Sequence, residues 1–404
     1  MNLILLLPKI PISENQGILI GEILIFGYMI IYILVKKKGI PISLEILLLF
    51  VFFTYNIIVS SLINGLHIST FPLHALLYYL RVISYFILIT CAYNFSEDDV
   101  AFLKYYFLIP FFIGTLISLS IMITRYIVNP PSVTEILWGY STGLRNTPIY
   151  GYSISKNSFL FLKPIGGGSG NLLCSWNIAV LIITRNIIWR KGYVRYKKIY
   201  YWVLIVAFIN VMLSFSRGGF LTLLLVFFYY ALQDSLKNKI DIKLIFGIVI
   251  TLTIIIFLIG NLMPASILDR LGNTIVNGKL DPSSYGRIEN YKTIFHNSKV
   301  LTLLFGSGFD EIVSKKNLGV QFAESFYLDI FRSSGILGLV LFMMFLVSVF
   351  KNAHHDIFLK SLAEFLALQS IIMWTITGGD FFSAPVLYFI FLMLGRSSLI
   401  SLFN

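Results

Sequence analysis

Apolar runs of about 20 residues recur along most of this chain and decide what it can fold into. A helical run of that length spans the hydrocarbon core of a bilayer, because each helical residue rises about 1.5 Å. Charged residues make up 12% of the sequence and hydrophobic residues 57%, whereas soluble domains carry about 25% charged residues. We therefore predict an all-α polytopic membrane protein in which residues 1–404 form a single integral membrane domain.

About eleven membrane helices, with a range of about 10 to 12, are expected from the apolar runs. The range reflects residues 2–7, a short apolar segment that fits a partial or interfacial helix. The predicted helices lie near residues 17–35, 42–63, 71–92, 101–124, 171–188, 199–215, 218–233, 242–261, 328–350, 358–377 and 383–402.

Lysine and arginine residues concentrate in the connections after the first, fifth, seventh and ninth predicted helices. Basic residues in short connections stay on the cytoplasmic side of a membrane, so we expect the N-terminus outside and the C-terminus inside. The long connections at residues 125–170 and 262–327 then face outward, and the second is expected to hold two or more short helices. The net charge of +12 fits this topology, and no basic soluble face remains for nucleic acid.

Two arginines lie where an anionic, lipid-borne substrate would approach the bundle. Arg217 belongs to the Ser-Arg-Gly-Gly motif at residues 216–219, and Arg287 to the Tyr-Gly-Arg motif at residues 285–287. A guanidinium group keeps its charge and binds two phosphate oxygens at once. Two such groups that converge would suit a diphosphate.

Each of these arginines also has a purely structural interpretation. Arg217 fits a snorkelling anchor at the membrane surface, and Arg287 fits an ion pair with Glu289 or Asp281. Gly218 and Gly219 favour the binding role for Arg217, because they leave room beside its guanidinium.

Arg81 and Glu324 are the other charged candidates. Arg81 is predicted near the middle of the third helix, where an arginine is a functional hypothesis by default. The competing interpretation is a buried ion pair with Glu22 or Glu45. Glu324 directly precedes the ninth predicted helix and is the candidate general base, although acidic residues at helix starts are also common as caps.

Glycines mark two further places of interest. The glycine run that ends at Gly170 is not a phosphate-binding loop, because no Gly-Lys-Ser/Thr follows it. A flexible connection or a close backbone approach is expected there, with Asn171 capping the next helix. Gly335 and Gly338 lie on one helical face and predict close packing against a neighbouring helix.

Histidines and cysteines show no metal-ligand spacing. Cys91 and Cys174 lie in apolar segments and are expected to be inert packing residues. We therefore expect no metal site and no cofactor.

In their order and spacing, these motifs resemble the O-antigen ligase/polymerase superfamily. The resemblance covers most of the chain in layout, while the motifs themselves fall within about residues 214–340. Arg145 ahead of Asn171 is similar to an arginine and an asparagine of the family's earlier outer loop. The motifs that carry the resemblance are residues 216–219, 285–287, 324–328 and 335–338.

The resemblance implies a GT-C-type glycosyltransferase of the bacterial inner (cytoplasmic) membrane whose active site faces the periplasm. Its substrates would be undecaprenyl-diphosphate-linked saccharides. It implies catalytic roles for Glu324, Arg217 and Arg287. The substrate-binding residues that it implies are Arg81, Arg145, Tyr285, Asn171 and Tyr327.

The residue at position 324 separates two branches of this superfamily. The ligase branch typically has a histidine there, whereas glutamate followed by Ser-Phe-Tyr-Leu is similar to the repeat-unit polymerase (Wzy) branch. We therefore predict an inverting, metal-independent polymerase that joins lipid-linked repeat units into O-antigen or a related surface polysaccharide. A chain-length regulator and a flippase would be its partners.

Two other functions stay open on the sequence alone. One is an O-antigen ligase that transfers the glycan to lipid A-core or another acceptor. The other is a lipid-linked sugar transporter or flippase. Transporters often carry internal symmetry and ionisable residues at the membrane midplane, whereas the charge here is concentrated in one outer connection and no repeat is visible.

Overall fold

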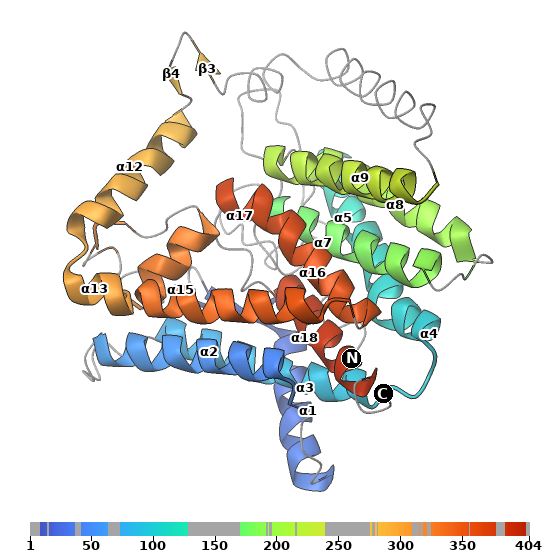
Figure 1. Cartoon of the computed structure of the whole chain (residues 1–404), viewed down its shortest axis with the longest axis horizontal. Helices are drawn as coiled ribbons and strands as arrows, with labels where there is room; N and C mark the ends of the chain where they lie inside the picture. The colour runs from blue at the N-terminus through green and yellow to red at the C-terminus, as the bar shows by residue number, and fades with distance from the viewer. Residues whose placement is uncertain are drawn as a thin grey trace.

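Helices form most of the computed structural model (Figure 1). The structure describes residues 9–13, 16–36, 42–63, 73–127, 170–190, 193, 196–214, 216–238, 275–276, 279–280, 282–308, 315, 318–320, 325–354, 356–376 and 384–400.

The described residues of the first part of the chain form eight α-helical segments and two short π-helical ones. They are α1 (Ile20–Lys36), α2 (Leu44–Ile63), α3 (Leu73–Tyr93), α4 (Asp99–Leu103), η3 (Lys104–Leu108), α5 (Ile109–Ile127), α7 (Gly170–Arg185), η5 (Asn186–Arg190), α8 (Lys197–Ser214) and α9 (Arg217–Asn238).

The second half adds the helices that follow the long second connection. They are α12 (Pro282–Asn297), α13 (Val300–Phe305), α15 (Phe326–Asn352), α16 (Ile357–Ile371), α17 (Met373–Ile376) and α18 (Ala384–Ile400). Each predicted membrane helix therefore has a counterpart, except the one near residues 242–261, which lies outside the described residues. The expected short helices of the second long connection are α12 and α13.

Four helical stretches of the described residues are long and apolar enough to cross a membrane: Asp99–Ser120, Asn171–Trp189, Lys197–Ser214 and Phe326–Asn352. Shorter apolar helices accompany them, at Ile20–Val35, Leu44–Ile58, Leu80–Tyr93, Gly218–Asp234 and Pro385–Ser398. A helix satisfies its own backbone groups, which is what the water-free bilayer core demands. The chain is a helical membrane protein.

Two small hairpins amend the all-α prediction. Strand β1 (Lys9–Ser13) pairs antiparallel with β2 (Gln16–Leu19), directly before α1. Strand β3 (Ile275–Val276) pairs with β4 (Lys279–Leu280) ahead of α12. Residues 2–7, the expected partial helix, lie outside the described part of the chain.

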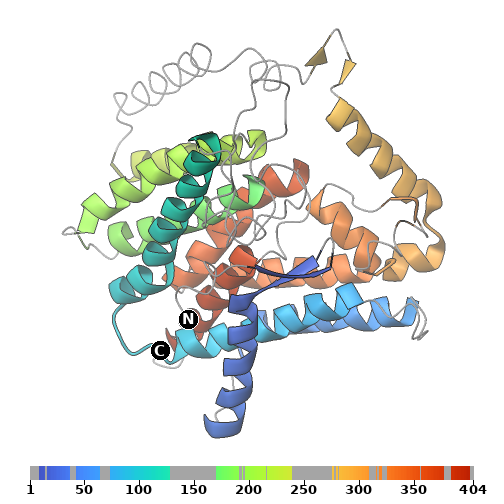
Figure 2. The same ribbon diagram turned by 180° about the vertical axis from the view of Figure 1, so that it is seen from behind.

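The stretch Asn171–Trp189, which contains most of α7, is the most enclosed of the four, and 94% of its apolar part is buried inside the protein. Helix α7 therefore lies at the centre of its neighbours. It contacts α8, α9, α16 and α18. On the other side of the bundle α3 packs along α18 and α2 packs along α15, as Figures 1 and 2 show from opposite sides. Apolar side chains on the outer faces, such as Leu34, Val35 and Trp202, are exposed, as lipid-facing residues would be.

A proline inside a membrane-length helix explains one of the π-helical turns. Pro110 has no N–H to donate to the carbonyl of Tyr106, four residues earlier. That carbonyl instead accepts a hydrogen bond from the Tyr388 hydroxyl on α18, at 3.1 Å. The stretch η3 precedes Pro110, and the helix continues through it into α5. A hydroxyl from a neighbouring helix thus replaces the missing backbone donor.

Candidate functional site

Helices α7 and α9 are joined at their first turns by Ser216 and Asn171. The Ser216 hydroxyl donates to Oδ1 of Asn171 at 2.5 Å. It also accepts the N–H of Gly219 at 3.0 Å, which makes Ser216 the N-cap of α9. Asn171 was expected to cap α7, and this is corrected: α7 begins at Gly170, so Asn171 lies inside the helix and binds Ser216 instead.

Arg217 is the first residue of α9, and its side chain lies outside the described part of the chain. Its backbone is held in place by the hydrogen bonds of the preceding residue, Ser216. Ser216 is held by Asn171, and the Ser216 amide donates to the Ser214 hydroxyl at 3.2 Å. The turn that carries Arg217 is therefore fixed to the start of α7.

Gly219 serves helix packing, and the room that it was expected to leave beside the Arg217 guanidinium stays a prediction. A Cβ at position 219 would lie 2.2 Å from the Sγ atom of Cys174 and 2.6 Å from its Cβ. Only glycine lets α9 approach α7 this closely. Cys174 is fully buried and contacts the Ser214 hydroxyl at 3.1 Å, in agreement with its expected packing role.

The start of α15 is fixed against α16 and α17. Ser325 has extended φ and ψ angles of −139° and 128° at the N-cap position. Phe326 packs on Trp374 of α17 with ring centroids 4.6 Å apart, and α15 also contacts α16. Glu324, the candidate base, lies outside the described residues, directly before this anchored start.

Helix α17 brings α9 and α15 into one neighbourhood, because it packs against both helices. Helix α7 joins them through Ser175, whose hydroxyl donates to Oε1 of Gln369 on α16 at 3.3 Å. Three of the predicted positions, Asn171, Arg217 and Tyr327, thus belong to elements that meet around α16 and α17.

Helix α12 carries Tyr285 and Arg287, whose side chains lie outside the described part of the structure. Its second half is anchored on α15, since Phe295 and Phe331 pack with ring centroids 5.5 Å apart. In Figures 1 and 2 the ribbons of α12 and α9 are separated, with the first half of α15 and α17 between them. The backbone of α12 is therefore not brought against the start of α9. Glu289, considered as a partner for Arg287, accepts from Lys292 at 3.2 Å.

Arg81 forms an ion pair across two helices, as its structural interpretation anticipated. Its Nε atom lies 2.5 Å from Oε1 of Glu22 on α1, and its Nη2 donates to Oε2 at 3.3 Å. The other suggested partner, Glu45, accepts from Ser348 and Asn352 on α15 at 2.8 and 2.6 Å. The Arg81 side chain remains 25% exposed, and its predicted contact with the substrate stays a prediction. Arg145 lies outside the described residues.

Helix α15 is broken at Gly335, and the loop after α13 fills the break. Gly335 has a φ of 64°, and a Cβ there would lie 2.4 Å from the Leu304 carbonyl group. Backbone N–H groups of Ser307 and Gly308 donate to the carbonyls of Arg332 and Ser333 at 2.7 and 2.9 Å. The predicted close packing at Gly335 is confirmed, but its cause is a left-handed backbone that only glycine adopts without strain.

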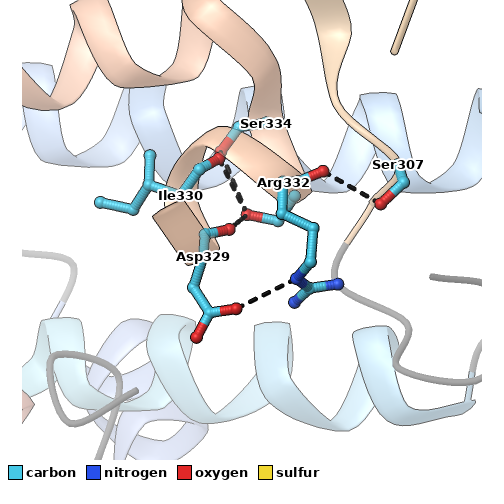
Figure 3. Close-up of polar contacts among 6 residues, drawn as sticks. Ser307, Asp329, Ile330, Arg332 and Ser334 are labelled. Atoms are coloured by element: carbon cyan, nitrogen blue, oxygen red, sulfur yellow. Dashed lines mark hydrogen bonds and ion pairs between the residues drawn. The ribbon is translucent and has the colours of Figure 1, made fainter. Parts of the chain in front are cut away.

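Sequence reasoning missed Arg332, the buried arginine just before this break. Its side chain is 5% exposed, and its Nε donates to Oδ1 of Asp329 at 3.0 Å (Figure 3). The signal was available, because Arg332 lies in a predicted membrane helix, as Arg81 does.

Part of the chain matches a known protein family. Residues 202–343 match the sequence model of a family described as O-antigen ligase. No curated protein and no solved structure matches the chain. The matched segment runs from α8 to α15 and includes positions 217, 287, 324 and 332. Residues 202–343 are thus similar to the O-antigen ligase family, which supports the resemblance to the O-antigen ligase/polymerase superfamily.

Proposed function

We propose that this protein is a polymerase that joins undecaprenyl-diphosphate-linked oligosaccharide repeat units into O-antigen or a related surface polysaccharide. The observation that carries the proposal is the match of residues 202–343 to the O-antigen ligase family. The packing of α17 on both α9 and α15 supports a shared site for Arg217 and Glu324.

In the proposed reaction a hydroxyl of the acceptor repeat unit attacks the anomeric carbon of the donor glycan. A new carbon–oxygen bond forms there, and the bond from that carbon to the lipid diphosphate breaks. The diphosphate leaves with the bonding electrons, and Glu324 accepts the proton of the attacking hydroxyl. Direct in-line attack inverts the anomeric configuration.

Arg217 and Arg287 hold the diphosphate and stabilise the charge that grows on it as it leaves. Both side chains are long, and in this proposal they reach the lipid head group from α9 and α12. Diphosphate is a good leaving group, so positioning and electrostatic stabilisation suffice for a reaction without a metal ion. Arg145, Tyr285, Asn171 and Tyr327 orient the lipid-linked saccharide.

The proposal places the protein in the bacterial inner membrane as a GT-C-type glycosyltransferase of about eleven spans. Its site faces the periplasm, where a flippase delivers the lipid-linked units and a chain-length regulator limits the product. The basic residues in the short connections support this orientation.

The ligase reaction is the second candidate, because the matched family is described as O-antigen ligase. The two reactions differ in their acceptor. A polymerase elongates lipid-linked repeat units in the absence of lipid A-core, whereas a ligase transfers the glycan only when lipid A-core or another final acceptor is present.

One assay with purified protein separates these functions. The protein is incubated with lipid-linked oligosaccharide extracted from cells that lack this protein, with and without lipid A-core. A ladder of polymer without lipid A-core is the expected result. A product that forms only with lipid A-core identifies the ligase, and the absence of any product under both conditions contradicts glycan transfer.

A further inference from the structure

Arg332 has a guanidinium that its surroundings use only in part. The side chain is 5% exposed, and its Nε binds Asp329 at 3.0 Å. Its Nη1 atom is buried and has no hydrogen-bond partner among the residues that the structure describes. A buried donor on a charged group that stays unpaired is costly for the fold. A buried polar atom without a partner calls for an explanation, and a ligand that completes the hydrogen bond is one.

Two other buried arginines of this protein show how a purely structural arginine is satisfied. Arg396 donates through Nη1 to the carbonyl of Phe95 at 2.6 Å and through Nη2 to Asp99 at 3.0 Å. Arg185 binds Asp234 at 2.7 Å and lies 4.2 Å above the ring of Tyr230. Arg332 differs from both, because one edge of its guanidinium has no described acceptor.

The break in α15 holds Arg332 in place. Its own carbonyl accepts the N–H of Ser307 at 2.7 Å and the Ser307 hydroxyl at 3.0 Å. Figure 3 shows the carbonyl directed to Ser307 and the Nε atom of the side chain facing Asp329. A side chain whose backbone and Nε are both fixed presents its remaining donor with little loss of entropy on binding.

Arg332 lies within reach of the proposed reaction site. It is two helical turns after Ser325, the N-cap of α15, which corresponds to about 10 Å along the helix axis. Glu324 directly precedes that N-cap. If Glu324 acts at the reacting carbon, Arg332 is too far away to touch that carbon. A sugar ring several bonds from the reacting carbon can still reach Arg332.

The charge of the pair identifies the class of ligand. Arg332 and Asp329 together are neutral, so they offer little net attraction to a diphosphate, which the unpaired charges of Arg217 and Arg287 suit better. The buried Nη1 group suits a neutral oxygen acceptor, such as a sugar hydroxyl or an acetamido carbonyl. We propose that Arg332 is a saccharide-binding residue whose Nη1 donates to an oxygen of the lipid-linked glycan. This inference rests on the proposed function and deepens it.

The test compares two lipids on one variant. In Asp329→Asn/Arg332→Met both charges are removed together, because a buried pair replaced as a unit is tolerated far better than a single deletion. Binding to purified protein is measured for bare undecaprenyl diphosphate and for the lipid-linked oligosaccharide extracted from cells that lack this protein. We expect the oligosaccharide-bearing lipid to bind about ten- to hundredfold more weakly than to wild type. Bare undecaprenyl diphosphate should bind as to wild type.

Arg185→Met/Asp234→Asn is the control, because it removes another ion pair of a buried arginine, between α7 and α9. It should bind both lipids as wild type does. Size-exclusion profiles and thermal unfolding verify that both double variants are folded. Turnover should show a raised KM for the glycosylated lipid with kcat little changed, which a general loss of structure would not produce.

Three results would overturn the assignment. Wild-type affinity of the Asp329→Asn/Arg332→Met variant for the glycosylated lipid removes Arg332 from saccharide binding. An equal loss for both lipids shows that the residue acts on the head group or on the fold. If wild-type protein binds neither lipid, the proposed function itself fails, and the inference fails with it.

Discussion

The hydroxyl of Ser216 binds Oδ1 of Asn171 at 2.5 Å and so joins the first turn of α9 to the first turn of α7. The same hydroxyl accepts the N–H of Gly219 at 3.0 Å. One side chain thus caps the helix that begins with Arg217 and fixes its start to a second helix. This contact fixes the backbone position from which the side chain of Arg217, the predicted phosphate-binding arginine, extends.

Ser216→Ala should therefore lower activity, although the Ser216 hydroxyl itself is not proposed to contact the substrate. Loss of an N-cap costs about 1 kcal/mol, and the loosened turn carries Arg217. We expect polymer synthesis to fall about five- to tenfold, measured as ladder intensity from purified protein. Ser216→Thr keeps the hydroxyl and should retain most of the activity. Wild-type synthesis by Ser216→Ala would show that the cap does not position Arg217.

Gly219→Ala should destabilise the protein. The new Cβ would lie 2.2 Å from the Sγ atom of Cys174, and overpacking of this kind costs about 1–3 kcal/mol. The expected result is a lower temperature of thermal unfolding in detergent.

Gly27→Ala is the matched control, because a Cβ at position 27 on α1 meets nothing within 4 Å. Alanine is the better helix former, so this variant should unfold at the same temperature or a higher one. Equal unfolding temperatures for the two variants would refute the close approach of α9 to α7.

The apolar runs of the sequence predicted the helices well, because membrane insertion depends on local hydrophobicity alone. The break at Gly335 was not predictable in this way, since the loop at residues 306–308 that fills it is distant in sequence. Gly219 illustrates the same point: its small size was recognised, but only the fold shows that Cys174 occupies the space.

The candidate site was predictable only in part. Short motifs identified Asn171 and the residues at 216–219, which the fold brings together. The separation of α12 from α9 depends on how the long connection folds, and no local pattern encodes it. Arg332 was missed because its importance lies in an unpaired buried atom, which composition and spacing do not reveal.

Arg81 and Glu22 offer a test of whether an intramembrane arginine is structural. Arg81→Ala removes the ion pair between α1 and α3, which should cost about 1–3 kcal/mol for a partly exposed pair. The exchange Glu22→Arg/Arg81→Glu restores opposite charges. If the pair serves the fold alone, the exchanged protein should recover both unfolding temperature and polymer synthesis. Recovery of stability without activity would instead support the predicted substrate contact of Arg81.

Tyr388→Phe removes the hydroxyl that replaces the backbone donor lost at Pro110. The buried carbonyl of Tyr106 is then unsatisfied, at a cost of about 1–3 kcal/mol. Pro110→Ala supplies an N–H four residues after Tyr106, so Tyr388→Phe should cost less in that background. A thermal-unfolding double-mutant cycle measures the difference. An equal cost in both backgrounds would show that the two donors do not substitute for one another.

The affinity of purified protein for bare undecaprenyl diphosphate tests most directly the claim that Arg217 and Arg287 grip the lipid diphosphate. If both arginines bind the diphosphate, Arg217→Ala and Arg287→Ala should each weaken binding by about tenfold or more. Lys292→Ala, which removes an exposed cation from the same helix as Arg287, should bind as wild type does. Wild-type affinity in both arginine variants would contradict the account.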